Sequence, residues 1–167
     1  MLILISGLPG SGKTTLARAF SAKTGIRHLN SDLLRRELHL MGHYNSKDKE
    51  KVYATLLEQT KTALLNAQHV VVDSTFYKES IRTPFRLLAA DCRVPMRWVE
   101  VCAQESTIRE RLKTPRPDSE ADYAVYEKIK NAEEPLPEPH LTLWSDAMPL
   151  QTMVDAILEY TTLPATT

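Results

Sequence analysis

A glycine-rich motif near the start of the chain constrains the fold more than any other feature. Residues 7–14 read GLPGSGKT and fit G-x-x-x-x-G-K-[S/T] at every fixed position. The motif follows the apolar, β-favouring residues 2–5, and it precedes Leu16, Ala17 and Phe20, which are spaced as on a helix. A buried strand, a glycine-rich loop and a helix in this order are the setting in which the motif binds nucleotide phosphates.

Each fixed residue of this P-loop has a chemical task. The glycines let backbone N–H groups surround a β-phosphate, Lys13 reaches the β and γ oxygens, and Thr14 places its hydroxyl on magnesium. The alternative is a glycine-rich turn that merely links strand to helix, and it fits less well because all four fixed residues and the flanking elements are correct. We therefore expect ATP and Mg²⁺ as cofactors, with the nucleotide held by Gly7, Pro9, Gly10, Ser11, Gly12, Lys13, Thr14 and Thr15.

The rest of the chain alternates strand patterns with helix patterns. Further strands are expected at residues 26–29, 70–73, 96–102 and 141–144, with helices between them and at 150–160. This alternation favours an α/β chain with the three-layer P-loop NTPase fold and a mainly parallel sheet. The length of 167 residues favours a single domain over residues 1–160, with a flexible tail at 161–167.

The charge balance limits the classes of partner. Lys and Arg total 21, and Asp and Glu also total 21, so no global field attracts nucleic acid or anionic lipid. A nucleic-acid end is possible as a substrate but is not favoured. No later apolar run approaches the roughly 18 residues of a membrane span, and the two cysteines form no metal or disulfide pattern. We expect a cytoplasmic protein without membrane association.

Several classes of P-loop protein fit poorly. A GTPase normally shows N-K-x-D and a D-x-x-G motif, whereas Asp73 is followed by Ser74, Thr75 and Phe76. Transport ATPases and ring-forming ATPases need additional domains that 167 residues do not provide. A compact kinase remains as the preferred class.

Three later segments make this class more specific: residues 31–35 (SDLLR), 70–74 (VVVDS) and 111–135. Their order and spacing over residues 1–136 resemble the small P-loop kinases, which include polynucleotide 5′-hydroxyl kinases, zeta-type toxins and chloramphenicol phosphotransferase. The resemblance implies ATP rather than GTP, and it implies transfer of the γ-phosphoryl group to an acceptor hydroxyl.

Asp32 and Arg35 are the candidate base and acceptor ligand. Asp32 follows the second strand at the carboxyl edge of the sheet, where open α/β folds bind ligands. The resemblance implies that Asp32 takes the proton of the acceptor hydroxyl and that Arg35 contacts the acceptor, and the spacing of three puts both on one helix face. The alternative is that Ser31 or Asp32 only caps the helix and that Arg35 is a solvated or ion-paired charge.

Asp73 ends the strand at residues 70–73, so its carboxylate should emerge beside the P-loop. We expect it to act with Thr14 at the metal, by orienting magnesium-bound water or Lys13. Orientation of the acceptor, which the resemblance also allows, and a simple turn at the strand end remain alternatives.

A basic segment is the candidate lid. Arg109 and Arg111 precede the proline-broken loop at residues 114–119, and Arg116 lies inside it between two prolines. The resemblance implies a lid in which Arg111 and Arg116 close over the phosphates and exclude water. The alternative is a solvated helix end in which Glu105 pairs with Arg109.

The sequence thus predicts an ATP-dependent P-loop kinase with Lys13, Asp32, Arg35, Arg111 and Arg116 as catalytic residues. Its acceptor is an unidentified small molecule or a nucleic-acid end. A polynucleotide 5′-hydroxyl kinase is the specific alternative within this class. From a different class, the chain could be a regulatory module that binds ATP and hydrolyses it slowly or not at all.

Overall fold

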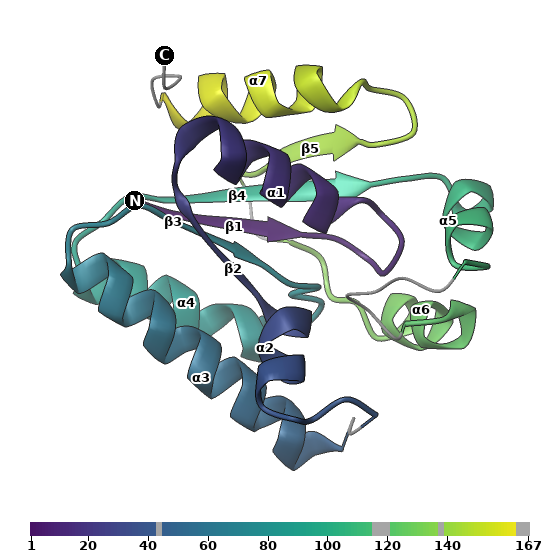
Figure 1. Ribbon diagram of the computed structural model, residues 1–167, viewed down its shortest axis with the longest axis horizontal. Coiled ribbons are helices and arrows are strands. Elements are labelled where there is room, and N and C mark those ends of the chain that lie inside the picture. Colours follow the sequence, from purple (N-terminus) through teal and green to yellow (C-terminus); the bar gives the residue numbers. More distant parts are fainter. Residues whose placement is uncertain (43–44, 115–120, 137–138, 163–167) are drawn as a thin grey trace.

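One parallel sheet organises the molecule (Figure 1). The computed structural model describes residues 1–42, 45–114, 121–136 and 139–162. Within them, five strands pair in the order β2-β3-β1-β4-β5, and all four pairings are parallel. The strands are β1 (Leu2–Ser6), β2 (Arg27–Asn30), β3 (Val70–Asp73), β4 (Met96–Cys102) and β5 (Leu141–Trp144).

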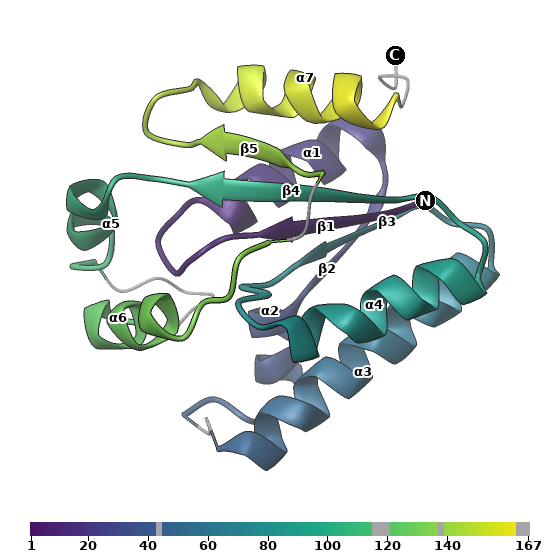
Figure 2. The same ribbon diagram turned by 180° about the vertical axis from the view of Figure 1, so that it is seen from behind.

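Helices cover both faces of this sheet, which confirms the predicted three-layer α/β fold. Helices α1 and α7 pack on one face, whereas α3 and α4 pack on the other; α5 and α6 lie beyond the carboxyl ends of the strands (Figures 1 and 2). The helices are α1 (Lys13–Thr24), α2 (Ser31–Glu37), α3 (Ser46–Leu65), α4 (Glu79–Asp91), α5 (Glu105–Arg111), α6 (Tyr123–Asn131) and α7 (Leu150–Thr161).

The end of α7 corrects one detail of the sequence prediction. Thr161, which we assigned to the tail, is the last residue of α7, and its side chain is fully buried. Its hydroxyl donates to the carbonyl oxygen of Ile157 at 2.7 Å, one helical turn earlier. Residues 163–167 of the predicted tail lie outside the described part of the chain. No helix in the described residues is both long and apolar enough to cross a bilayer.

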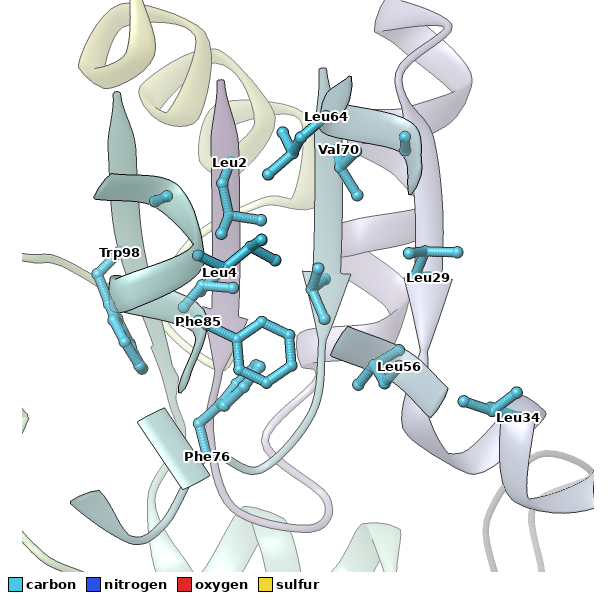
Figure 3. Close-up of a cluster of buried hydrophobic side chains, with 14 of the residues drawn as sticks. Leu2, Leu4, Leu29, Leu34, Leu56, Leu64, Val70, Phe76, Phe85 and Trp98 are labelled. Atoms are coloured by element: carbon cyan, nitrogen blue, oxygen red, sulfur yellow. The ribbon is translucent and has the colours of Figure 1, made fainter. Parts of the chain in front are cut away.

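The apolar run of β1 is unbroken because both of its faces are covered. Leu2 and Leu4 point into the core beneath α3 and α4, whereas Ile3 and Ile5 point into the core beneath α1 and α7. Figure 3 shows Leu2 and Leu4 close to Phe85 of α4 in the first of these cores. All four β1 side chains are fully buried, so β1 forms the centre of the molecule.

Phe76 fixes the loop that follows β3. Its ring is fully buried and packs edge-on against Phe85 and Trp98, with ring centroids 5.2 and 5.6 Å apart. Its backbone has φ 49°, in the left-handed region that side-chain-bearing residues rarely adopt. Because the buried ring offsets this strain, the loop from Ser74 to Lys78 is held at a defined position at the edge of the sheet.

The strand order places the loops that follow the strands at one edge. The chain passes from β1 to β2 on one side of β1, and it later crosses from β3 to β4 on the other side. Open α/β sheets bind ligands where the strand order reverses in this way, outside the carboxyl ends of the strands. The registers bring Ile5 and Asn30 level with Asp73, so the ends of β1, β2 and β3 meet at that edge.

Candidate active site

The P-loop passes closely over the neighbouring strand. Gly7 has φ 148°, and a Cβ there would lie 2.4 Å from the carbonyl oxygen of Val101 in β4 and 2.6 Å from the hydroxyl oxygen of Ser11. Gly12, with φ 96°, is the residue just before α1. Glycine is therefore required at Gly7 by the close approach to β4 and favoured at Gly12 by the left-handed backbone.

The start of α1 has the properties of an anion site. Among the described residues, no side chain hydrogen-bonds to the N-terminus of α1, so its first backbone N–H groups are available to a ligand. Lys13, the first residue of the helix, is only 8% exposed, and Thr15 is exposed. The predicted nucleotide ligands all belong to this loop and the first turn of α1: Gly7, Pro9, Gly10, Ser11, Gly12, Lys13, Thr14 and Thr15.

Asp73 lies at the centre of a buried polar cluster. Its Oδ2 accepts a hydrogen bond from Asn30 Nδ2 at 2.6 Å, and His28 Nε2 lies 3.5 Å from the same oxygen. Burial opposes ionisation of the Asp73 carboxyl, but the contact with His28 and the positive charge of Lys13 hold its pKa below the usual range. Asp73 is therefore a carboxylate under the influence of the P-loop lysine, and its predicted role at the metal stays a prediction.

The second oxygen of Asp73 leaves room for a further ligand. Within the described residues, Asp73 Oδ1 is buried and has no hydrogen-bond partner, and the Thr14 hydroxyl is close enough to help lower the pKa of this carboxyl. A bare carboxylate oxygen beside a threonine hydroxyl suits Mg²⁺ or a water bound to it. The described residues contain no cluster of three or more His, Cys, Asp or Glu able to hold a metal alone. Magnesium would share this site with nucleotide phosphates, which is its usual mode.

Asn30 is the cap of α2, one of three adjacent residues, with Ser31 and Asp32, whose side chains the sequence offered for this role. Asn30 Oδ1 accepts the backbone N–H of Leu33 at 2.8 Å. The carboxylate of Asp32 is therefore not the group that caps the helix. Neither Asn30 nor His28 had been singled out as a site residue. The signal that could have found them is their spacing of two in β2, which puts both side chains on the same face as Asp73 of the paired strand.

A pocket of about 400 Å³ opens beside the P-loop. Pro9 and Lys13 form one wall, and α2 contributes Asp32 and Arg35. The other walls come from α3, from the loop after β3 and from α6. The structure therefore brings together Lys13, Asp32 and Arg35, three of the five residues predicted to be catalytic.

Arg111 contacts the P-loop itself. Its Nη1 donates to the carbonyl oxygens of Gly10 and Ser11 at 3.1 and 3.3 Å and to the Ser145 hydroxyl at 2.8 Å. The Ser145 hydroxyl also donates to the carbonyl of Ser11, at 2.5 Å. Arg111 thus joins the P-loop to the loop after β5, and its predicted closure over phosphates stays a prediction. Arg116 lies outside the described residues.

A family model matches most of the chain. The model for AAA_33, described as an AAA domain, matches residues 2–136, from β1 to the segment after α6. The chain belongs to this family.

Sequence relatives of this AAA_33 chain include an uncharacterised protein of Mycobacterium tuberculosis, 30% identical over 102 residues, and the L-seryl-tRNA(Sec) kinase of Methanococcus maripaludis, 32% identical over 97 residues. The matches cover 54% and 55% of this chain but only 20% and 37% of those proteins. The chain therefore spans less than two fifths of the curated relatives it matches.

Solved structures show the same fold over nearly the whole chain. A sugar kinase from Janibacter sp. HTCC2649 superposes with a TM-score of 0.76 at 15% identity, covering 99% of this chain and 98% of its own. The Mycobacterium tuberculosis APS kinase CysC, in complex with AMPPNP and APS, superposes with a TM-score of 0.72 at 19% identity, covering 96% of each chain. The AAA_33 chain thus has the fold of the P-loop kinases, which confirms the predicted resemblance at that level.

Helices α5 and α6 of this AAA_33 chain are joined by one carboxylate. Glu105 accepts hydrogen bonds from the Tyr123 hydroxyl and from Lys130 Nζ, both at 2.6 Å. Hydrogen bonding from Lys130, followed by that from Tyr123, holds the pKa of Glu105 below its usual range. Arg109 Nη2 lies 4.0 Å from Glu105 and donates to the Tyr123 hydroxyl at 2.7 Å. The predicted alternative, a Glu105–Arg109 pair, is thus present alongside stronger contacts.

The chain after α6 is anchored to α4. Glu134 Oε2 accepts the backbone N–H of Glu79 at 2.6 Å, and the backbone N–H of Glu134 donates to the carbonyl of Tyr77 at 2.8 Å. Arg82, fully buried, donates to the carbonyl oxygen of Glu134 at 3.0 Å. These bonds fix the position from which α6 extends across the sheet edge.

Helix α6 contributes to two pockets. Val125 and Lys128 line the pocket that contains Lys13 and Asp32. Tyr126 and Lys130, on another face of the helix, line a second pocket of about 370 Å³, which is bounded by Gly7, by the end of β4 and by α5. The P-loop and α6 therefore lie between the two pockets.

Proposed function

We propose that this chain is an ATP- and Mg²⁺-dependent phosphotransferase that moves the γ-phosphoryl group to a hydroxyl of an acceptor bound in the pocket beside the P-loop. The observation that carries the proposal is that Lys13 of the P-loop and Asp32 of α2 line the same pocket. A phosphate-binding lysine and a carboxylate facing one space are what an in-line transfer between two bound substrates needs.

Each residue has a task in this proposal. The P-loop N–H groups and Lys13 bind the β- and γ-phosphates, and Thr14 with Asp73 holds the metal ion that screens the phosphate charge. Asp32 accepts the proton of the acceptor hydroxyl while the hydroxyl oxygen of the acceptor bonds to the γ-phosphorus. The bond from that phosphorus to the β–γ bridging oxygen breaks, and ADP leaves. Arg35 orients the acceptor.

The lid residues complete the proposal. Arg111 and Arg116 add positive charge near the phosphates and help to exclude water, so that transfer is preferred to hydrolysis. Because Arg111 donates to P-loop carbonyls, we assign it first to shaping the loop around the nucleotide. The proposal implies a cytoplasmic location, where ATP is supplied.

The acceptor class separates the alternatives. The kinases that resemble this chain are named for seryl-tRNA, a sugar and APS, so their names do not select one acceptor. A polynucleotide 5′-hydroxyl kinase remains the specific alternative, and an ATP-binding regulatory module remains the alternative from another class. The pocket favours transfer over a purely regulatory role because it adds a second ligand space to the nucleotide site.

Label transfer from γ-labelled ATP tests the proposal. The purified protein is incubated with Mg²⁺ and panels of hydroxyl compounds that include sugars, sugar phosphates, nucleosides and 5′-hydroxyl oligonucleotides. Lys13→Ala provides the background, and release of free labelled phosphate is measured in parallel. We expect transfer to one acceptor class above the Lys13→Ala background. ATP binding without transfer to any member of the panels would favour the regulatory module.

A further inference from the structure

The acceptor pocket carries an excess of positive charge. Besides Lys13, four cations line it from four different segments: Arg35 of α2, Lys49 of α3, Lys78 from the loop after β3, and Lys128 of α6. Asp32 is the only carboxylate among the described residues that line the pocket. In a chain with 21 basic and 21 acidic residues, five cations against one carboxylate among the described lining residues is a strong local departure from balance.

The cations affect one another across the pocket. Partial burial lowers the pKa of Lys49, and the charges of Lys128, Arg35 and Lys78 lower it further. These three neighbours come from three other segments, so the fold brings them together against their mutual repulsion. Such an arrangement is stabilised when an anion occupies the space between them.

Three lysines outside the pocket are paired with carboxylates. Lys23 lies 2.8 Å from Asp155, Lys130 lies 2.6 Å from Glu105, and Lys113 lies 2.5 Å from Glu110. By contrast, the described residues offer no carboxylate within ion-pairing distance of the Lys49 or Lys128 ammonium group. Lys49 and Lys128 therefore differ from these three paired lysines, and they differ from the exposed Lys51 and Lys61 because they line one pocket with other cations.

We propose that the acceptor is a small hydroxyl compound with its own anionic group, a phosphate, sulfate or carboxylate, and that Lys49 and Lys128 bind this group. Arg35 and Lys78 flank the anion, while the hydroxyl reaches Asp32 beside Lys13. Val52, Tyr53 and Val125 provide an apolar surface for the body of the acceptor. The volume of about 400 Å³ is that of a small-molecule site rather than a groove for a polymer. This inference rests on the proposed function, because it names the acceptor of the same site.

A binding experiment tests the anion site separately from catalysis. The protein is first saturated with Mg²⁺ and AMP-PNP so that the P-loop cannot take up the probe, and inorganic phosphate and sulfate are then titrated in by calorimetry. The test variant is Lys49→Met with Lys128→Met. The control is Lys51→Met with Lys61→Met, which removes the same charge from exposed positions of α3 that do not line the pocket.

We expect the test variant to bind both anions at least about tenfold more weakly than wild type, since it loses two charge-assisted bonds to the anion. The control variant should bind them within about twofold of wild type, and AMP-PNP affinity should be unchanged in both. Equal anion binding by the test and control variants would overturn the proposal, as would the absence of anion binding to the AMP-PNP-loaded wild type.

A second arm addresses the acceptor and its size. Transfer is compared for pairs that differ only in charge, such as a sugar and its phosphate, and for a 5′-hydroxyl oligonucleotide. We expect the charged small compound to have the lower KM and the test variant to raise that KM with a smaller effect on kcat. Preference for the neutral member or for the oligonucleotide would contradict the assignment. Anion binding that depends on Lys49 and Lys128, without transfer to any compound, would instead refute the proposed kinase activity and leave the anion site intact.

Discussion

Asn30 Nδ2 donates a 2.6 Å hydrogen bond to Asp73 Oδ2, and the Oδ1 of the same amide caps α2 by accepting the N–H of Leu33. One side chain therefore connects the buried carboxylate beside the P-loop to the helix that carries Asp32 and Arg35. The relative position of the proposed metal ligand and the proposed base is set by this amide.

Replacement of Asn30 by Asp tests that connection. Aspartate caps helices as well as asparagine does, so the cap of α2 is retained, but two carboxylates now face each other in a buried site. We expect a loss of stability of roughly 2–4 kcal/mol at neutral pH in chemical denaturation. The loss should shrink as the pH falls, because one carboxyl of the pair is then protonated. Asn45→Asp, at the exposed cap of α3, is the control and should cost far less.

Replacement of Asp32 by Asn separates catalysis from structure. Because Asn30 is the cap, Asn at position 32 should leave stability and Mg·ATP binding nearly unchanged. Transfer to the acceptor should fall by roughly 10²–10⁴-fold if Asp32 is the general base. Asp91→Asn, at the exposed end of α4, serves as the control. Wild-type turnover in Asp32→Asn would reject the catalytic role.

Replacement of Arg111 by Lys tests the support of the P-loop. Lysine keeps the charge, but it cannot reach the carbonyl of Gly10 and the oxygens of Ser145 with one planar group. We expect a loss of about 1–2 kcal/mol in stability and weaker binding of Mg·AMP-PNP by calorimetry. The control is Arg109→Lys, which alters a contact with the Tyr123 hydroxyl and none with the P-loop, and it should preserve nucleotide affinity. Equal nucleotide affinity in wild type and Arg111→Lys would show that the loop does not depend on this residue.

The lowered pKa of Lys49 predicts a pH dependence. The ordinary pKa of lysine is 10.5, and the pKa of Lys49 in the folded protein lies below it, so folding disfavours the protonated amine. The ammonium form therefore destabilises the folded state at neutral pH, and this cost disappears as the pH rises through the interval between the folded value and 10.5. Acylation of Lys49, followed by mass spectrometry across that range, reports its titration.

The titration of Lys49 should respond to its neighbours. After burial, the charge of Lys128 is the next largest cause of the lowered Lys49 pKa. Lys128→Met removes that charge, so the midpoint of Lys49 acylation should move to higher pH. Lys61→Met, at an exposed position of α3, should leave the midpoint in place. An unmoved midpoint in Lys128→Met would mean that the two ammonium groups do not interact across the pocket.

The sequence predicted the elements of this fold closely, because each one depends on local patterns. Four successive apolar residues predict a strand buried on both faces, as β1 is. The spacing of Leu16 and Phe20 predicts a helix buried on one face, as α1 is. The P-loop was equally predictable, since the motif and its flanking elements occur together. The location of Asp32 and Arg35 in one pocket followed from the end of β2 and the start of a helix.

The parts that the sequence did not predict depend on contacts between distant segments. The Asn30–Asp73 bond requires β2 to pair with β3, and the Arg111–Gly10 bond requires α5 to lie over the P-loop. Periodicity identifies strands but does not give their order in the sheet. Lys49 and Lys128 were missed for the same reason, because each is an ordinary lysine within its own helix, and only the assembled pocket distinguishes them.

Helix α6 is the shared partition between two compartments, since Lys128 faces one of them and Tyr126 faces the other. A rotation of α6 that moves its side chains into one pocket moves the side chains on its other face out of the second pocket. If a ligand in either compartment turns α6, the free energy of filling that compartment includes a contribution from its neighbour. Thermodynamic linkage makes this contribution symmetric, so each occupant would strengthen or weaken the other by the same factor. Helix α6 has nine residues and is followed by the Glu134 anchor, so the helix is the element through which ligands in the two pockets would affect each other's binding.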